Sequence, residues 1–343
     1  MNSRKIHSAH GPKSWNQTAQ KNAKADLLIG IESVGYTYFD LLNPIRFLRI
    51  LWKTDVFHFY AGYTLLPIST NHFRLYALLG GFDIRILKLF RKKIVLHYQG
   101  CELRDRFNEE AQVVCTNCKR KEVYCRNDRA TGRRKRIISN SRRADALVVT
   151  TPDLKQYLEP LNSTWIPKIG LNLSEHNSRN ISQSGKLKII HAPSNRSIKG
   201  SDKVIEVISK HSDKFELILL ENVSREEVYR NALQADLAVD QLRIGWYGNF
   251  AVEMMSIGLP VICFIKRSFI PDSLNEFPII NASPVNLEDV LLEIYENRNF
   301  ANTKKALNTI YLKRHHSEEA ITGKLKSVYD KIFRNTQGRN SKK

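Results

Sequence analysis

The chain has 343 residues, of which 42% are hydrophobic, so it is long enough for two domains that each bury an apolar core. No run of about 18 consecutive apolar residues occurs, which excludes a membrane-spanning helix, and the first residues lack the apolar centre of a secretory signal, so we expect a cytoplasmic protein. The outlying feature is a formal net charge of +20, which favours a polyanionic partner: nucleic acid, anionic lipid or a phosphorylated ligand.

Short apolar runs alternate with helical patterns along the whole chain. In the first half the expected strands are Lys5–Ala9, Leu27–Ile31, Val56–Tyr60, Lys93–Tyr98 and Ala146–Thr150, and the expected helices are Leu42–Trp52, Phe73–Leu79 and Arg134–Arg143. In the second half the strands are Leu187–His191, Phe215–Leu220, Leu237–Asp240 and Val261–Phe264, separated by helices Ser201–Lys210, Arg225–Gln234 and Leu287–Asn297. Ser224 and Glu227 have the spacing of a capping box. Strands separated by helices favour parallel βαβ units, so the expected class is α/β.

A stretch rich in Asn, Ser and Gly, residues 168–186, indicates a boundary between two domains. We therefore expect an N-terminal domain over residues 1–168, with an insertion at about 111–136, and a C-terminal domain over 187–316. Residues 317–334 carry a helix whose apolar stripe predicts that it packs back on the body. The basic tail, 335–343, is expected to be disordered.

One segment, Ala235–Ile262, has the pattern of a binding site in an α/β protein. Its first strand ends in the carboxylate of Asp240, and a loop from Gly245 to Gly248 follows. We expect Asn249 to cap the next helix and Glu253 to lie in its first turns, near the positive end of the helix dipole. Ligands of open α/β sheets bind at the carboxyl ends of the strands, so the segment predicts a ligand site.

Two motifs then carry a resemblance to a known family. Glu253–Val261 (EMMSIGLPV) follows the glycine loop, and His191–Gly200 (HAPSNRSIKG) follows an apolar strand. Together they resemble the donor-site signature of GT-B glycosyltransferases of family 4, and Thr150–Leu154 and Trp165–Pro167 resemble the end of that family's N-terminal domain. The resemblance implies a GT-B fold, in which two Rossmann-like doubly wound domains face each other across a cleft. It also implies a retaining, metal-independent transfer of sugar from a nucleoside diphosphate sugar, with no cofactor required.

The resemblance and the residue chemistry assign roles at the donor site. Arg196 and Lys199 would hold the diphosphate, whose negative charge grows as the glycosidic bond breaks. Glu253 would accept hydrogen bonds from ribose hydroxyls. Sugar and phosphate would be held by the amides of the glycine loop, namely Gly245, Trp246, Tyr247, Gly248 and Asn249. The family pairs two acids as E-x7-E, but the first position is Gly245 here, and only Asp240 lies nearby to substitute.

The acceptor side is expected in the N-terminal half. Leu96–Arg104 resembles a strand end written H-G-S-D-x-R in related enzymes, with Gln99 in place of the histidine. Strand alternation places His97 on the same face, so His97 is either the catalytic group or a structural histidine, as is His58 with less support. The other candidate acceptor-side residues are His10, Gly11, Gly100, Glu102 and Arg104. The expected acceptor is a glycan or a lipid-linked glycan of surface polysaccharide biosynthesis.

Four cysteines have spacing compatible with structural zinc or with thiols that stay reduced: Cys101, Cys115, Cys118 and Cys125. A fifth, Cys263, belongs to a buried strand. Basic runs at residues 119–121 and 133–136, with Arg142 and Arg143, are either a solvated face or a surface attracted to the anionic inner leaflet of a membrane.

Two other classes of function stay open. The first is a basic zinc-containing nucleic-acid binder, although the region lacks the aromatic spacing of stacking platforms, so nucleic acid is not the expected partner. The second is a non-catalytic GT-B partner that binds nucleotide-sugar, which Gly245 and Gln99 favour. Turnover of a nucleotide-sugar distinguishes an enzyme from both.

Overall fold

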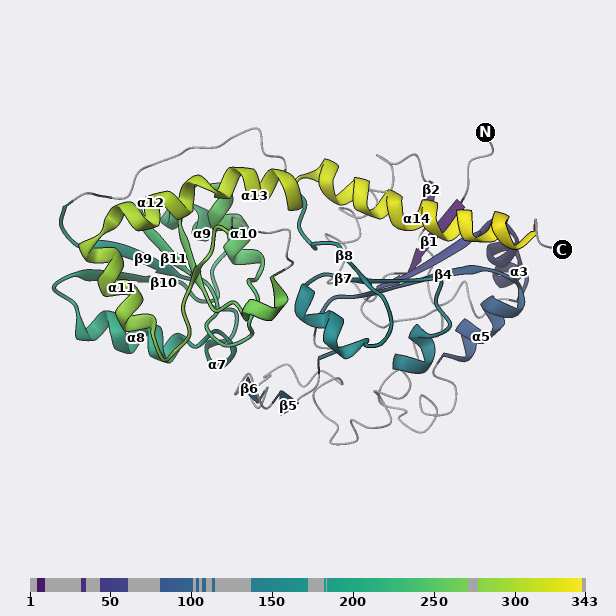
Figure 1. Ribbon diagram of the computed structural model, residues 1–343, viewed down its shortest axis with the longest axis horizontal. Coiled ribbons are helices and arrows are strands. Elements are labelled where there is room, and N and C mark those ends of the chain that lie inside the picture. The colour runs from purple at the N-terminus through teal and green to yellow at the C-terminus, as the bar shows by residue number, and fades with distance from the viewer. Residues whose placement is uncertain are drawn as a thin grey trace. The chain divides into compact units, whose positions relative to one another are not determined.

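Figure 1 shows a computed structural model of the chain, which describes residues 5–9, 32–34, 44–60, 81–100, 103–104, 107–108, 113–114, 137–171, 182, 184–270 and 277–340. The chain forms two compact units. Unit 1 comprises Met1–Asp105, Lys121–Pro167 and Ile321–Lys343, and unit 2 comprises Arg106–Arg120 and Lys168–Ala320. Each unit contains its own parallel sheet, as expected for strands separated by helices.

The described part of unit 1 is built on a six-stranded sheet in the order β2-β1-β3-β4-β7-β8. All neighbouring strands in this sheet are parallel. The elements are β1 (Lys5–Ala9), β2 (Glu32–Val34), α3 (Pro44–Lys53), β3 (Val56–Tyr60), α5 (Phe82–Leu89), β4 (Lys93–Tyr98), β7 (Ala146–Val149), a 3-10 helix (Pro152–Tyr157) and β8 (Thr164–Trp165). β3 and β4 are almost wholly buried, so their sequences, VFHFY and KIVLHY, do not alternate between apolar and polar residues along the strand.

Unit 2 has a five-stranded parallel sheet in the order β10-β9-β11-β12-β13. The elements from the sheet onward are β9 (Leu187–His191), α7 (Arg196–Lys199), α8 (Ser201–Lys210), β10 (Phe215–Leu219), α9 (Arg225–Ala232), β11 (Leu237–Val239), α10 (Asn249–Ser256), β12 (Val261–Cys263), a 3-10 helix (Arg267–Phe269), β13 (Ile280–Asn281), α11 (Leu287–Glu296), α12 (Arg298–Ala306) and α13 (Asn308–His315). A small antiparallel pair, β5 (Phe107–Asn108) with β6 (Val113–Val114), also belongs to this unit. The apolar faces of α8 and α11 pack on one side of the sheet and form its core.

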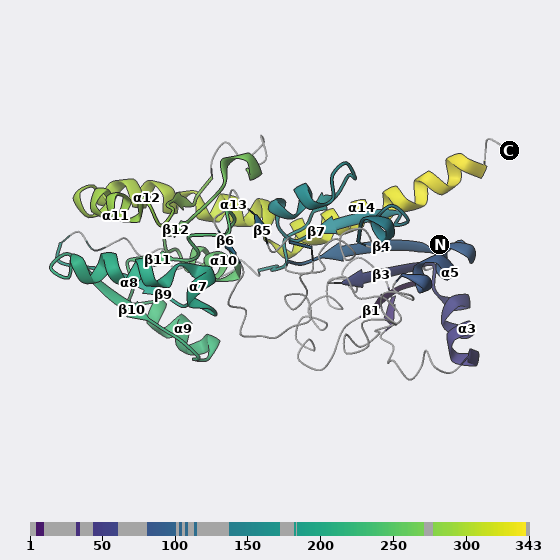
Figure 2. The same cartoon turned by 90° about the horizontal axis from the view of Figure 1, so that it is seen from below.

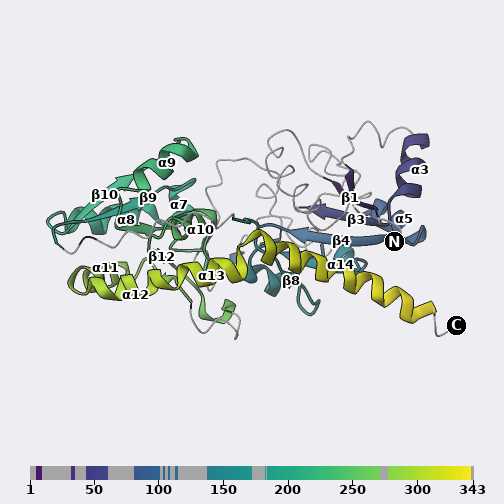
Figure 3. The same ribbon diagram turned by 90° about the horizontal axis from the view of Figure 1, so that it is seen from above.

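The last helix, α14 (Glu318–Asn340), begins in unit 2 and returns the chain to unit 1. Leu325, Val328 and Ile332 pack against the sheet of unit 1, where Figure 3 shows the helix lying along β4. The helix continues beyond Arg334, where we expected a disordered tail to begin. Helical structure extends to Asn340 because no proline interrupts the basic segment that follows the apolar stripe.

Most of the predicted elements that fall on described residues are present. Val56–Tyr60, Lys93–Tyr98, Leu187–His191 and Ser201–Lys210 have the predicted bounds. The short edge strands β2, β8 and β13 and the helices α5, α12 and α13 were not expected. A strand of two or three residues is too short to show a clear period. The predicted strand Leu27–Ile31 and helix Phe73–Leu79 lie outside the described residues. No helix in the part of the chain that the structure describes is both long enough and apolar enough to cross a bilayer.

Candidate functional site

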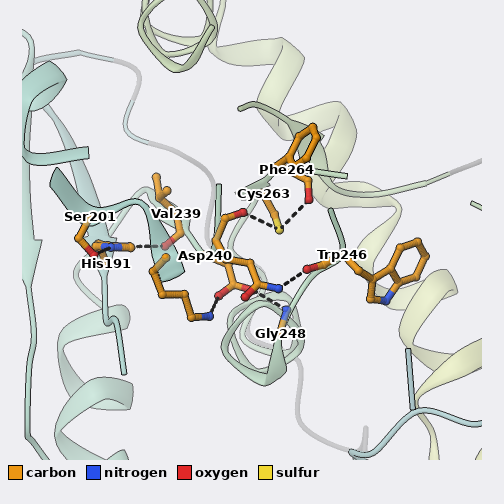
Figure 4. Close-up of polar contacts among 10 residues, drawn as sticks. His191, Ser201, Val239, Asp240, Trp246, Gly248, Cys263 and Phe264 are labelled. Atoms are coloured by element: carbon orange, nitrogen blue, oxygen red, sulfur yellow. Dashed lines mark hydrogen bonds and ion pairs between the residues drawn. The ribbon is translucent and has the colours of Figure 1, made fainter. Parts of the chain in front are cut away.

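The strand order of unit 2 places a topological switch point between β9 and β11. These two strands are neighbours, while β10 lies on the outer side of β9. Crevices that bind ligands in doubly wound sheets lie outside the carboxyl ends of the strands at such a switch point. The residues that follow β9 and β11 are the predicted phosphate-binding segment and the predicted glycine loop, so both motifs meet at this edge of unit 2 (Figure 4).

Asp240 is the centre of this edge. It follows β11, and its side chain is fully buried. One carboxylate oxygen forms an ion pair with Lys199 Nζ, and the other accepts a hydrogen bond of 2.6 Å from the amide of Gly248 (Figure 4). The Lys199 carbonyl in turn accepts a 3.1 Å hydrogen bond from the amide of Leu242. Asp240 therefore joins the two motifs, which the sequence separates by about forty residues.

The glycine loop turns its aromatic side chains into unit 2. Gly245 has φ +87°, and a Cβ there would lie 3.3 Å from Lys266 Cβ. Trp246 and Tyr247 are 1% and 4% exposed. The Tyr247 hydroxyl lies 2.6 Å from the Tyr311 hydroxyl on α13, and burial raises the pKa of Tyr247. The predicted donor contacts of Trp246 and Tyr247 can therefore involve only their backbones, because both rings are part of the core.

The start of α10 differs from the prediction. Gly248, not Asn249, is the N-cap residue, and no side chain of the helix caps it. The Gly248 amide donates to the Asp240 carboxylate. Glu253 is the fifth residue of α10, within its first turns as expected, and its carboxylate pairs with Arg225 at 3.0 Å. The helix ends at Ser256, and Gly258, two residues later, has φ +81°, the left-handed conformation in which glycine commonly follows a helix.

Arg196 also faces a carboxylate. Its Nε donates to Glu221 Oε1 at 2.9 Å, and its Nη2 donates to the other oxygen, which makes a bidentate pair. The guanidinium is about half exposed, and the hydrogen bonds that it donates to Glu221 raise its pKa. Both predicted phosphate-binding cations, Arg196 and Lys199, are thus paired with acids at the edge where a diphosphate would lie.

Sequence reasoning missed Glu221 and Arg225, although each had a local signal. Glu221 comes two residues after β10, so it belongs to the same carboxyl edge as Asp240. Arg225 follows Ser224, whose hydroxyl accepts a 3.1 Å hydrogen bond from the Glu227 amide and so begins α9 as predicted. Nothing in the sequence indicates that these residues pair with Arg196 and Glu253.

His191, the first residue of the basic motif, has a structural role. Its Nδ1 donates to the Val239 carbonyl at 2.8 Å, so Nε2 accepts from the Ser201 hydroxyl, also at 2.8 Å (Figure 4). Burial lowers the pKa of the imidazole, which keeps it neutral. The side chain therefore joins β9, β11 and the start of α8 below the site. Cys263 is buried in the core, as predicted.

The predicted catalytic histidine, His97, lies in a buried cluster of unit 1. It is 8% exposed, and its Nδ1 is 3.2 Å from Nε2 of His58. The other nitrogen of His58 lies 2.6 Å from the hydroxyl of Tyr329 on α14, and the ring of Tyr60 stacks on His58. These contacts favour the structural alternative for both histidines.

Of the predicted acceptor-side residues, Gly100 and Arg104 are described. Gly100 is buried, and its carbonyl accepts the amides of the turn that ends at Arg104. The Arg104 guanidinium forms a bidentate pair with Asp153, which is 2% exposed, and contacts the Thr151 hydroxyl. This geometry stabilises the turn. The remaining candidates, His10, Gly11 and Glu102, and the cysteines Cys101, Cys115, Cys118 and Cys125 lie outside the described residues. Within the described residues, no group of three or more His, Cys, Asp or Glu side chains is arranged to hold a metal ion.

Comparisons with known proteins agree with this architecture. No protein-family model matches the sequence, and no curated protein matches it significantly. Solved structures do match. Sucrose-phosphate synthase from Thermosynechococcus elongatus has a TM-score of 0.62 and 13% identity, over 97% of this chain and 100% of that one. HepE of Anabaena, in complex with UDP-glucose, has a TM-score of 0.56 and 11% identity, over 95% and 99%.

A glycosyltransferase from Rickettsia africae has a TM-score of 0.58 and 14% identity, over 98% of this chain and 100% of that one. At these identities the likeness shows the fold. The chain therefore has the GT-B fold with two Rossmann-like units, as the sequence predicted.

Proposed function

We propose that the chain is a glycosyltransferase that moves a sugar from a nucleoside diphosphate sugar to a hydroxyl of a glycan acceptor. The observation that carries the proposal is the cluster at the switch point of unit 2, where Arg196, Lys199 and the start of α10 meet at the carboxyl edge. Two cations and a helix N-terminus suit a diphosphate. The fold is shared with HepE, whose structure contains UDP-glucose, so uridine donors are the first to test.

The ion pairs assign different tasks to the two cations. Arg196 and Glu221 are both partly exposed, so a diphosphate can replace Glu221 on the guanidinium without opening the core. Lys199 is held by the buried Asp240 and acts as a fixed positive charge behind the site. Because the Gly248 amide is also taken by Asp240, the donors to phosphate would be the following amides of the first turn of α10. Glu253 would accept the ribose hydroxyls by releasing Arg225.

In the proposed reaction the bond from the anomeric carbon to the diphosphate oxygen breaks, and a bond to the acceptor oxygen forms. The acceptor proton passes to the departing diphosphate. The cations stabilise the charge that grows on this leaving group. Retention of configuration and independence of metal and cofactor are part of the proposal, and the resemblance to family 4 supports them.

A non-catalytic protein that binds nucleotide-sugar is the second candidate, and the geometry at Gly245 favours it. A glutamate there would need a left-handed backbone, and its Cβ would press on Lys266. Asp240 is a poor substitute, because its carboxylate is buried and already has two partners. If the chain is an enzyme, the contact to the transferred sugar comes from another residue.

Binding and turnover of donor test the proposal and separate these candidates. A thermal-shift panel of UDP-, GDP- and ADP-sugars identifies the donor, because a ligand that binds only the folded state raises the melting temperature. Release of nucleoside diphosphate then reports turnover. Binding with turnover supports the enzyme, and binding without turnover supports the second candidate.

A matched pair of variants tests the site itself. Arg196→Gln removes a partly exposed cation from Glu221, and Lys210→Gln removes an exposed cation from Glu288 at 2.7 Å, away from the switch point. We expect Arg196→Gln to weaken donor binding about tenfold or more, since a hydrogen bond to a charged group contributes about 1.5 kcal/mol or more. Lys210→Gln should bind donor normally. Equal binding by both variants would refute the site.

The remaining parts of the proposal concern the acceptor and the surroundings. We propose a lipid-linked glycan acceptor, made for surface polysaccharide at the inner face of an anionic membrane, and the net charge of +20 supports this. Structural zinc on Cys101, Cys115, Cys118 and Cys125 stays a prediction. Metal analysis of the purified chain tests it, and chelation that lowers the melting temperature would support it.

A further inference from the structure

Helix α3 exposes an apolar stripe to solvent although its opposite face is buried in unit 1. Ile50 and Leu51 are 2% and 3% exposed, so this face of the helix is buried in unit 1. Ile45, Leu48 and Trp52 are exposed, and Trp52 reaches 89%. The three positions follow the spacing i, i+3 and i+7, so they form one stripe along the helix. Single exposed apolar residues are ordinary, but a stripe with a tryptophan at its end marks an interaction surface.

The end of α5 adds to the same region. α3 ends at Lys53 and α5 ends at Leu89, just before the first residues of β3 and β4, Val56 and Lys93. These two residues are paired in the parallel register, and the Lys93 amide donates to the Asp55 carbonyl at 3.0 Å. The carboxyl ends of the two helices therefore meet at the amino edge of the sheet, and Figures 1 and 2 show both helices at that end of unit 1.

Leu89 and Phe90 are exposed there at 81% and 51%. This edge is opposite to the carboxyl ends of the strands, where ligands of such sheets bind. The exposed apolar surface is thus separate from any site that unit 1 provides for an acceptor.

The charged residues of α3 itself are all basic. The sequence of α3, PIRFLRILWK, contains no acid, and its exposed Arg49 and Lys53 lie beside the stripe. Arg91 is exposed directly after Phe90. Apolar side chains next to a tryptophan and flanked by cations are typical of a helix that lies in the interface of an anionic bilayer. Cations alone are enough to bind nucleic acid, so a nucleic-acid partner does not explain the exposed apolar stripe.

We propose that α3 and the end of α5 form a docking surface for an anionic lipid bilayer, with Trp52 and Leu89 entering the headgroup region and Arg49 and Lys53 contacting lipid phosphates. This surface would provide the membrane contact of the proposed function, and its biological purpose rests on that function. It does not depend on the donor chemistry, because none of its residues belongs to unit 2.

Flotation of the full chain with vesicles tests the surface, using phosphatidylcholine alone or with phosphatidylglycerol added. We expect tighter binding to the anionic vesicles, and Arg49→Glu/Lys53→Glu should weaken it about 25-fold or more, at roughly fivefold for each cation lost. The control Lys313→Glu/Arg314→Glu, two exposed cations of α13, should keep most of the binding. Trp52→Ser/Leu89→Ser should weaken binding about tenfold or more, whereas Val285→Ser, which changes a residue 89% exposed in unit 2, should not.

Three outcomes overturn the proposal. They are equal binding by the α3 variants and their controls, a concentration-dependent dimer that Trp52→Ser abolishes, or retention of nucleic acid that Arg49→Glu/Lys53→Glu abolishes while vesicle binding stays unchanged. Circular dichroism confirms that each variant is folded. Donor thermal shifts measured on the same variants separate the two proposals. A variant that loses vesicle binding but binds donor normally shows that the docking surface is separate from the donor site. If no variant, nor the parent, binds donor, the proposed function fails, but the vesicle results still test the docking surface.

Discussion

Replacing Lys199 with methionine tests whether the buried ion pair with Asp240 organises the candidate site. Methionine has a similar length and no charge, so the substitution leaves the carboxylate in place without its cation. Asp240 is 1% exposed, and the Gly248 amide remains its neighbour at 2.6 Å. The perturbation therefore creates an uncompensated charge in the interior of unit 2.

The expected cost follows from this burial. Removing one partner of a buried ion pair destabilises a protein by about 3–5 kcal/mol, and Lys199 is itself only 12% exposed, so solvent screens the pair little. Asp240→Asn in the same background removes the stranded charge, while its amide oxygen still accepts from Gly248. The double variant Lys199→Met/Asp240→Asn should regain about 2 kcal/mol or more.

Urea unfolding of the single and double variants measures this coupling. Hydrogen exchange of residues 236–256 gives a second reading, because β11 and α10 open when the pair is lost. If the effects of the two substitutions add to within about 0.5 kcal/mol, the pair does not organise the site and the reasoning is refuted. Loss of donor binding in Lys199→Met is interpretable only beside the double variant, since instability alone would also cause it.

Three further predictions concern the surroundings of the site. Hydrogen bonds from Lys210 and His211 lower the pKa of the Glu288 carboxyl group to about 2 in the folded state. The ionised carboxylate therefore stabilises unit 2 fully above the unfolded-state pKa of about 4.3. This stabilisation is lost as the pH falls toward 2. Glu288→Gln should therefore flatten the pH dependence of the urea midpoint in this range. Tyr247→Phe removes the hydroxyl that meets Tyr311 and should cost about 1–3 kcal/mol in denaturant unfolding. Arg104→Lys replaces a bidentate pair with a point charge and should cost about 1–2 kcal/mol, without changing acceptor affinity in kinetic assays.

Each of these variants has a matched control on an exposed or half-buried position. Glu296→Gln, Tyr229→Phe and Arg85→Lys should leave the corresponding measurement unchanged. A Glu288→Gln midpoint with the same slope below pH 5 as the parent contradicts the titration argument. A Tyr247→Phe variant as stable as the parent would mean that its hydroxyl contributes nothing, and an Arg104→Lys variant of normal stability with a raised acceptor KM would restore Arg104 to the acceptor site.

Local patterns were sufficient to predict most of the secondary structure in the described residues. The apolar runs Val56–Tyr60 and Leu187–His191 have strand-like length and turn residues at their ends, and Ser201–Lys210 repeats with a helical period, so each element is encoded by neighbours along the chain. Their alternation also predicted parallel sheets, because parallel strands need crossover helices.

The position of the candidate site was likewise determined by the sequence. The glycine loop and the basic motif each follow a buried strand, and residues at carboxyl ends gather at one edge of a parallel sheet. What each side chain does there was decided by the tertiary structure. Gly245 and Gly248 look alike in the sequence, yet Gly245 has a positive φ and Gly248 gives its amide to Asp240.

The pairings at the site depend on the order of the strands, and a sequence pattern does not contain that order. Lys199 meets Asp240 because β9 lies beside β11, and Arg196 meets Glu221 because β10 lies on the other side of β9. His58 meets Tyr329 across 271 positions because the last helix returns to unit 1. The sequence by itself thus determined the elements, the class of fold and the edge that carries the site, which arise from local periods. Only the tertiary structure decided which charges neutralise one another, because those contacts form between segments that are distant in the chain.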